Sequence, residues 1–147
     1  MSSAIAVAQV ALEVEGGVQK SISAKDWAAM PHQALTVTNP HTKRQETYEG
    51  VLLRRLLDEV GVAAGEKIHG AELRNYIVVV AKDGYAAVLA LADVDPSLRK
   101  NQIIVADKLD GQPLDEKHGP LQVVVPEDER HARWVRMVTK ITVRRAQ

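Results

Sequence analysis

The sequence has 147 residues, of which 46% are hydrophobic and 26% are charged, as in globular proteins rather than disordered or coiled-coil chains. Nineteen basic and nineteen acidic residues cancel, so no net field attracts nucleic acid or an anionic membrane surface, and we expect no nucleic-acid partner. The chain has no cysteine, which excludes disulfides, thiolate metal sites and cysteine nucleophiles.

The sequence pattern shows neither a membrane span nor an intact signal peptide. No apolar run reaches the roughly 18 residues that a membrane-spanning helix needs, so we expect no membrane insertion. The opening stretch MSSAIAVAQVALEVEG has no basic residue and already contains Glu13 and Glu15, which is not the pattern of an intact signal peptide.

The first part of the chain alternates short strands with a short helix. Alternating apolar and polar residues predict strands over residues 12–15 and 35–38. Between these strands, Ser23 and Asp26 have the spacing of a capping box, which predicts a helix that Pro31 stops.

The clearest helix signal covers residues 51–60, where leucine and valine repeat at helical spacing. We expect the intervening polar residues, among them Arg54 and Arg55, to cover the solvent side of this helix. Gly61 is expected to end it.

The rest of the chain is dominated by strands. Apolar runs predict strands over residues 76–80, 85–91, 103–106, 121–125 and 140–144. Asp83-Gly84 and Asp110-Gly111 predict tight turns, and residues 131–138 predict one more short helix. Because the elements do not follow a strict βαβ order, we expect an α+β fold, a single domain over residues 1–147 with a mixed β-sheet and a few short helices.

One cluster of charged and aromatic residues stands out near the end of the chain. Arg130, Arg133 and Arg136 lie three residues apart and would line one side of the predicted helix, with His131 and Trp134 between them. Guanidinium groups bind phosphate or carboxylate, and an indole can stack on a flat heterocycle. The cluster is therefore either an anion site or a solvated face whose arginines pair with the preceding acidic residues, and Trp134 alone is typical of a core residue.

Motifs for catalysis and metal binding do not occur in the sequence. There is no Gly-rich phosphate loop, no HExxH and no G-x-S-x-G, and the five histidines lack helical pair spacing. The sequence therefore predicts no catalytic residue and no metal site.

Several short blocks occur in a recognisable order between Tyr48 and Val143. They are Tyr48-Glu49-Gly50-Val51-Leu52, Lys82-Asp83-Gly84-Tyr85, Ile104-Val105-Ala106-Asp107, Asp110-Gly111-Gln112-Pro113-Leu114, Gly119-Pro120-Leu121 and Arg133-Trp134-Val135. In order and spacing they resemble the molybdopterin-binding domain of the sulfite oxidase family. The resemblance implies a sulfite oxidase-like mixed-sheet fold with a cleft for a pterin or molybdopterin.

One departure from the family pattern bears on function. Catalytic members of the family hold molybdenum through a cysteine in a Cys-x-Gly-Asn type segment, and residues 36–44, which stand in that place, contain no cysteine. The resemblance therefore implies a bacterial, non-catalytic pterin-binding module without molybdenum, acting as a sensor or carrier for a partner protein such as a membrane sensor. Similar short relatives imply a periplasmic location if a signal peptide has been removed, and a cytoplasmic one otherwise.

The resemblance also implies where the ligand binds. Tyr85 and Arg133-Trp134 match positions in the family motifs, and the other candidates adjoin them or lie in the loop that replaces the metal-binding segment. The expected ligand-binding residues are Tyr85, Arg133, Trp134, Arg130, His131, Asn39, His41 and Arg44.

Two alternatives stay open at this point. One is a molybdopterin-dependent oxidoreductase that holds the metal through a non-thiolate ligand such as His41. The other is a protein-interaction domain whose cleft has decayed.

Overall fold

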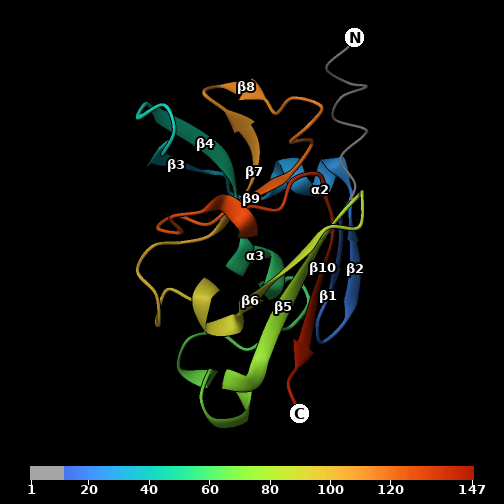
Figure 1. Ribbon diagram of the computed structural model, residues 1–147. Coiled ribbons are helices and arrows are strands. Elements are labelled where there is room, and N and C mark those ends of the chain that lie inside the picture. The colour runs from blue at the N-terminus through green and yellow to red at the C-terminus, as the bar shows by residue number, and fades with distance from the viewer. Residues whose placement is uncertain (1–11) are drawn as a thin grey trace.

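The computed structural model describes residues 12–147, which form two β-sheets with short helices in the connections between strands (Figure 1). The first sheet has the strand order β2-β1-β10-β5-β6, comprising β1 (Leu12–Glu15), β2 (Gln19–Ile22), β5 (Asn75–Ala81), β6 (Ala86–Ala90) and β10 (Val138–Arg145). The second sheet has the order β3-β4-β7-β8 with β9 also paired to β7, comprising β3 (Gln33–Thr38), β4 (Gln45–Leu52), β7 (Ile104–Leu109), β8 (Gln112–Pro113) and β9 (Gln122–Val124). The helices are α2 (Ala24–Ala29) and α3 (Leu53–Asp58), with short 3-10 helices η1 (Gly65–Lys67), η2 (Gly70–Arg74), η3 (Leu91–Val94) and η4 (His131–Arg133).

The first sheet is mixed because β1 and β10 pair in parallel, whereas its other strand pairs are antiparallel. β10 lies in the middle of this sheet, where Ile141 stands opposite Val14 of β1 on one side and opposite Val79 of β5 on the other. All three side chains are at most 1% exposed, so the centre of the sheet is also part of the hydrophobic core. The predicted α+β fold with a mixed sheet is confirmed.

Helix α2 begins as the capping pattern predicts. The Ser23 hydroxyl accepts a hydrogen bond from the Asp26 backbone N–H at 3.0 Å, and the Asp26 carboxylate accepts one from the Ser23 N–H at 3.3 Å. The helix buries Trp27, whose indole N–H donates to Asp107 of β7 at 3.0 Å. This contact ties α2 to the second sheet.

Helix α3 is shorter than its periodicity predicts. Val51 and Leu52 belong instead to β4, where they pair with Val105 and Ile104 of β7. The prediction of a helix over 51–60 is therefore wrong at its start, because pairing with a distant strand outweighs helical spacing in these residues. Gly61 has a φ of 74° just past the helix and ends it as expected. No helix within residues 12–147 is long and apolar enough to cross a membrane.

The predicted helix over 131–138 is wrong. Only the single 3-10 turn η4 forms there, and the chain then runs alongside the segment that contains β9. The Val135 carbonyl accepts from the Val123 N–H at 2.9 Å, and the Val138 N–H donates to the Leu121 carbonyl at 3.0 Å. These backbone groups are bonded between segments, so they cannot form a helical ladder.

The prediction that Arg54 lies on the solvent side of the helix is wrong, because the structure buries this residue. Its side chain is only 8% exposed. The guanidinium donates to the carbonyls of Ala63 and Val62 at 2.8 and 2.9 Å and to Asp58 at 3.0 Å, and it lies 3.6 Å from the carboxylate of Asp95. Arg54 thereby fastens helix α3 to the loop that follows it.

Asp95, the acidic partner of Arg54, is 1% exposed. Burial alone would raise the pKa of this carboxyl, but hydrogen bonds from Ser97 and from the Gly65 N–H, together with the charge of Arg54, hold the pKa below its usual value. Asp95 is therefore an ionised carboxylate in the interior, and the positive charge of Arg54 helps to stabilise its charged form.

We expect Arg54→Met to lower the free energy of unfolding by about 2–4 kcal/mol, because it leaves the buried Asp95 carboxylate without its counter-charge and two carbonyls without their donor. The matched control is Arg55→Met in the same helix, since Arg55 is 38% exposed and pairs with Glu59 at the surface. That change should cost under about 1 kcal/mol. Urea unfolding of both variants checks the difference, and equal losses would show that the buried position of Arg54 carries no extra stability.

Candidate functional site

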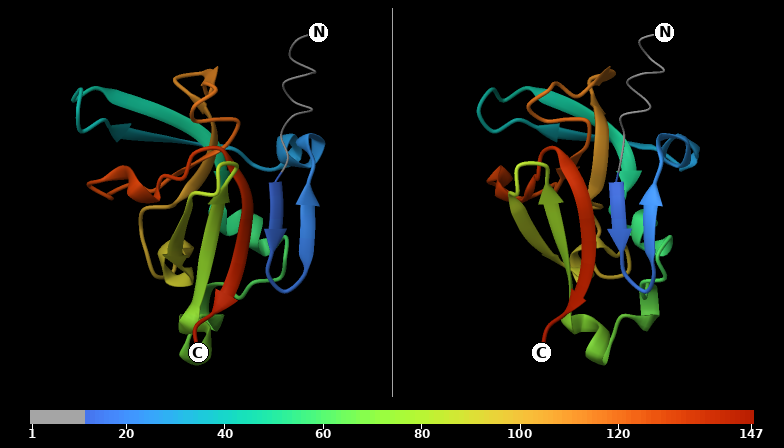
Figure 2. Two further views of the ribbon diagram at one scale, coloured as in Figure 1. Left: turned by 45° about the vertical axis from the view of Figure 1, so that its right-hand side comes forward. Right: turned by 90° about the vertical axis from the view of Figure 1, so that its right-hand side faces the viewer.

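Three adjoining hollows lie around η4, and the side chains of His131 and Trp134 line all three. Their volumes are about 350, 310 and 400 Å³, and we call them the first, second and third hollow. The second lies against β4 and the loop after β8, and the third lies against β3 and the loop after β9. Figure 2 shows η4 and the β3–β4 hairpin projecting on the same side of the molecule.

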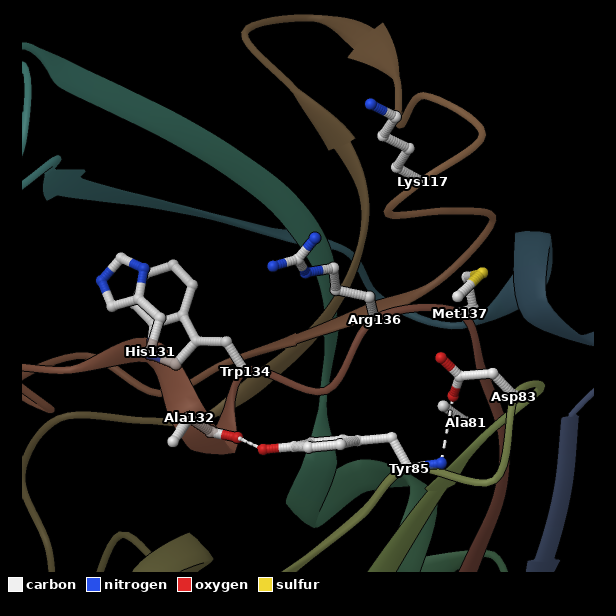
Figure 3. Close-up of a pocket in the computed structure, with 9 residues that line it drawn as sticks. All are labelled: Ala81, Asp83, Tyr85, Lys117, His131, Ala132, Trp134, Arg136 and Met137. Atoms are coloured by element: carbon white, nitrogen blue, oxygen red, sulfur yellow. Dashed lines mark hydrogen bonds between the residues drawn. The ribbon is translucent and has the colours of Figure 1, made fainter.

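The first hollow is the one that Figure 3 shows. It is lined by Ala81, Asp83, Tyr85, Lys117, His131, Ala132, Trp134, Arg136 and Met137. These residues come from the end of β5 and the β5–β6 turn, the loop before β9, η4, and the segment between η4 and β10. Its volume falls within the range of small-molecule sites, and its lining combines aromatic rings with both signs of charge.

Tyr85 presents a ring to the first hollow in a fixed position. The predicted Asp83-Gly84 turn is confirmed, with a φ of 90° at Gly84, and the Asp83 carboxylate accepts from the Tyr85 N–H at 3.0 Å. The Tyr85 hydroxyl donates to the Ala132 carbonyl at 2.5 Å, as drawn in Figure 3. The residue is still 50% exposed, so a held aromatic ring remains accessible.

Arg136 and Lys117 supply positive charge to the same hollow. Both side chains lie across it from the Tyr85 ring in Figure 3. Neither forms an ion pair with any of residues 12–147. Their donors are therefore available to an anionic group, which guanidinium and ammonium groups bind through charge-assisted hydrogen bonds.

The second hollow is lined by polar groups that can donate and accept hydrogen bonds. Burial raises the pKa of Tyr48 to about 12, with the charges of Glu46 and Asp110 adding to the shift, so its hydroxyl stays protonated. His118 Nδ1 lies 2.6 Å from the Asp115 carboxylate, and this hydrogen bond lowers the pKa of Asp115. The Arg136 side chain lines both this hollow and the first.

Trp134 is a core residue that also forms the common wall of the hollows. It is 4% exposed, and its indole N–H donates to the Val125 carbonyl at 3.0 Å. The Tyr48 ring meets it edge-on at 5.8 Å, and the His131 imidazole stacks flat on it, with the centroids 3.6 Å apart and the planes inclined by 5°. Burial lowers the pKa of His131, which favours the neutral imidazole.

Arg133 does not share in the first hollow. Its guanidinium makes two hydrogen bonds of 2.8 Å to the Asp128 carboxylate and lies 3.5 Å from Asp93. The hydrogen bond to Asp128 raises the pKa of Arg133. The pairing of an arginine with a preceding acidic residue, which the sequence left open, is therefore what the structure shows at this position.

The remaining expected site residues lie farther out. Asn39 lines the second hollow, but its side-chain oxygen accepts from the backbone N–H groups of His41 and Thr42, which shapes the β3–β4 turn. His41, Arg44 and Arg130 are exposed and are not among the residues that line the three hollows. The structure thus brings together Tyr85, His131, Trp134 and Asn39 of the predicted set.

Three charged residues of the first hollow, Asp83, Lys117 and Arg136, were missing from that set. Asp83 was predicted only as part of a turn. Arg136 carried a signal, because it is the third member of the arginine series. Lys117 carried none, since a lysine in a polar loop is ordinary in any sequence. Only the folded chain shows that these two cations face one hollow.

Comparison with known proteins identifies the family. A family model described as oxidoreductase molybdopterin binding domain matches residues 2–147, so the chain belongs to this family. The resemblance inferred from the ordered sequence blocks is thereby confirmed. No curated protein matches the sequence.

The residues around the hollows fit the organic part of such a cofactor better than its metal. A ring face, a carboxylate and two cations without an ion pair in the described part of the chain suit a flat, phosphorylated heterocycle. The sequence contains no cysteine to supply a thiolate. Within residues 12–147, no three His, Asp or Glu side chains lie close enough together to hold a metal ion.

We expect Trp134→Ala to lower the free energy of unfolding by about 3–5 kcal/mol, because it empties a buried site and removes the hydrogen bond to Val125. Tyr85→Ala, at a half-exposed ring, should cost under about 1.5 kcal/mol, which is the contribution of its one hydrogen bond. Chemical denaturation monitored by circular dichroism compares the two. A stable Trp134→Ala protein would show that the indole is not a core residue.

Proposed function

We propose that this chain is a non-catalytic pterin-binding module that binds a phosphorylated pterin in the first hollow and acts as a sensor or carrier for a partner protein. The observation that carries the proposal is the accessible, fixed ring of Tyr85 facing two cations that have no ion-pair partner among residues 12–147, all within one hollow. Family membership supports a molybdopterin-type ligand.

The ring system of a pterin suits the Tyr85 side of the hollow. Pterins are flat and carry an amino group that donates hydrogen bonds at the ring edge. A heterocycle stacked on Tyr85 would present this edge to Asp83, one of whose carboxylate oxygens already bonds to the Tyr85 N–H. The second oxygen remains an acceptor, so Asp83 selects for an amino-substituted ring.

The phosphate of the ligand suits the opposite side. Arg136 offers a planar guanidinium group and Lys117 a flexible ammonium group, and proteins commonly bind phosphate through these two groups. Arg133 does not serve this purpose, because its charge is neutralised by Asp128 and Asp93.

The non-catalytic role rests on the missing thiolate. A ligand held by stacking and ion pairing alone is released reversibly, as a sensor or carrier requires. Tyr85 also joins the β5–β6 turn to η4 through its hydrogen bond to the Ala132 carbonyl. A ligand on this ring therefore lies beside two surface segments to which a partner protein could bind.

We expect the protein to bind a pterin monophosphate saturably and to bind it about tenfold or more weakly when Tyr85→Ala removes the stacking ring or Arg136→Met removes the guanidinium. Isothermal titration calorimetry measures the affinities, and quenching of the tryptophan fluorescence, to which Trp27 and Trp134 both contribute, reports ligand binding. The two variants should differ for pterin without phosphate, which loses affinity with Tyr85→Ala but not with Arg136→Met.

The matched control is Arg130→Met, which removes an exposed arginine outside the hollows and should leave the affinity within about twofold. Absence of binding by the wild-type protein at millimolar pterin would overturn the proposed function. An equal effect of Arg130→Met and Arg136→Met would move the anion site to the outer surface.

A further inference from the structure

The His131 side chain stands where the three hollows meet. It lines each of them together with Trp134, and the first and second hollows share Arg136 as well. A ligand that extends from one hollow into the next must therefore pass the His131–Trp134 stack. Figure 3 shows this stack at one end of the first hollow, with the Arg136 side chain extending toward it.

The two members of the stack differ in how firmly they are held. Trp134 is buried, bonded to the Val125 carbonyl and packed against Tyr48. His131 is exposed as a residue, with one face of its ring covered by the indole, and its side chain makes no hydrogen bond to the described residues 12–147, so stacking holds the imidazole in place. The indole therefore stays in place, whereas the imidazole that covers one of its faces can rotate away.

The backbone beneath His131 does not need to move for the imidazole to rotate away. Arg133 bridges back to Asp128 through two hydrogen bonds, which close the loop that carries η4. The Trp134 N–H also donates to the His131 carbonyl at 3.1 Å. Rotation about the His131 side-chain bonds is thus sufficient to uncover the indole, and exposed side chains rotate rapidly.

We propose that His131 is a specificity-determining gate that sets the length of ligand the cleft accepts. With His131 stacked on Trp134, the first hollow takes a bicyclic ring such as pterin. With the imidazole swung away, the cleft opens into the neighbouring hollow, and a second aromatic ring of a longer ligand takes its place on the indole. This inference rests on the proposed function, because it concerns ligands that enter by the first hollow.

If His131 is a gate, removing its side chain should strengthen the binding of a ligand, whereas removing a residue that only contacts the ligand weakens binding. A longer ligand has to displace the imidazole, so its affinity is reduced by the free energy needed to unstack His131 from Trp134. A short ligand leaves the stack in place and is not affected. Removing the imidazole removes that cost, so His131→Ala should tighten the binding of long ligands only.

The test uses two probes, pterin and pteroic acid, the latter a pterin extended by an aminobenzoate ring that carries a carboxylate. Calorimetry should show that His131→Ala binds pteroic acid roughly three- to tenfold more tightly than the wild type, the size of one aromatic pair. Pterin affinity should change less than about twofold. The matched control is His131→Phe, whose ring keeps the indole covered and should give no gain for pteroic acid.

A second readout follows the imidazole itself. In the free wild-type protein, the His131 ring protons should be shifted upfield in the NMR spectrum by the stacked indole, and saturation with pteroic acid, but not with pterin, should abolish the shift. Equal or weaker binding of pteroic acid by His131→Ala, while pterin still binds, overturns the gate and leaves the proposed function standing. Failure of both probes to bind both proteins overturns the proposed function and the gate together.

Discussion

The candidate site depends on the backbone of residues 134–138, which crosses from one sheet to the other and is hydrogen-bonded on both sides. Val135 is bonded to Val123, whereas Met137 donates to the carbonyl of His118 and accepts from the N–H of Lys82. This double attachment joins the β5–β6 hairpin to the loop before β9. It also fixes the direction in which Trp134 and Arg136 leave the backbone, Trp134 into the core and Arg136 into the hollows. The site is therefore built at the seam between the two sheets.

The three arginines of the series 130, 133 and 136 show that the number of charges in a cluster says little about its capacity to bind an anion. They have the same spacing, yet one is exposed outside the hollows, one is neutralised by two carboxylates, and one faces the first hollow without an ion pair among residues 12–147. Only the last retains its donors for a ligand. Spacing alone would rank the three equally, because the difference arises from the neighbours that folding brings to each guanidinium.

Much of the fold could be predicted from local signals, and the failures have a common physical cause. The capping box of α2, the Asp83-Gly84 and Asp110-Gly111 turns and the apolar strands are encoded within a few residues. Strand β2 and the first part of β4 are polar, so only pairing with partners elsewhere in the sheet reveals them. The same limit applies to the site. Tyr85 lay in a recognisable motif, but nothing near Lys117 in the sequence indicates that it lies across a hollow from that ring.

The central place of β10 in the first sheet has a consequence for how the protein is made. Until residues 138–145 have left the ribosome, the β1–β2 and β5–β6 hairpins have no strand to join them, and the inner edges of β1 and β5 stay unpaired. The contacts that close this sheet link residues from opposite ends of the described chain, which are the slowest kind to form. Folding of the sheet is therefore completed after synthesis of its last strand, and a nascent chain that stalls before this point exposes two open strand edges to chaperones and proteases.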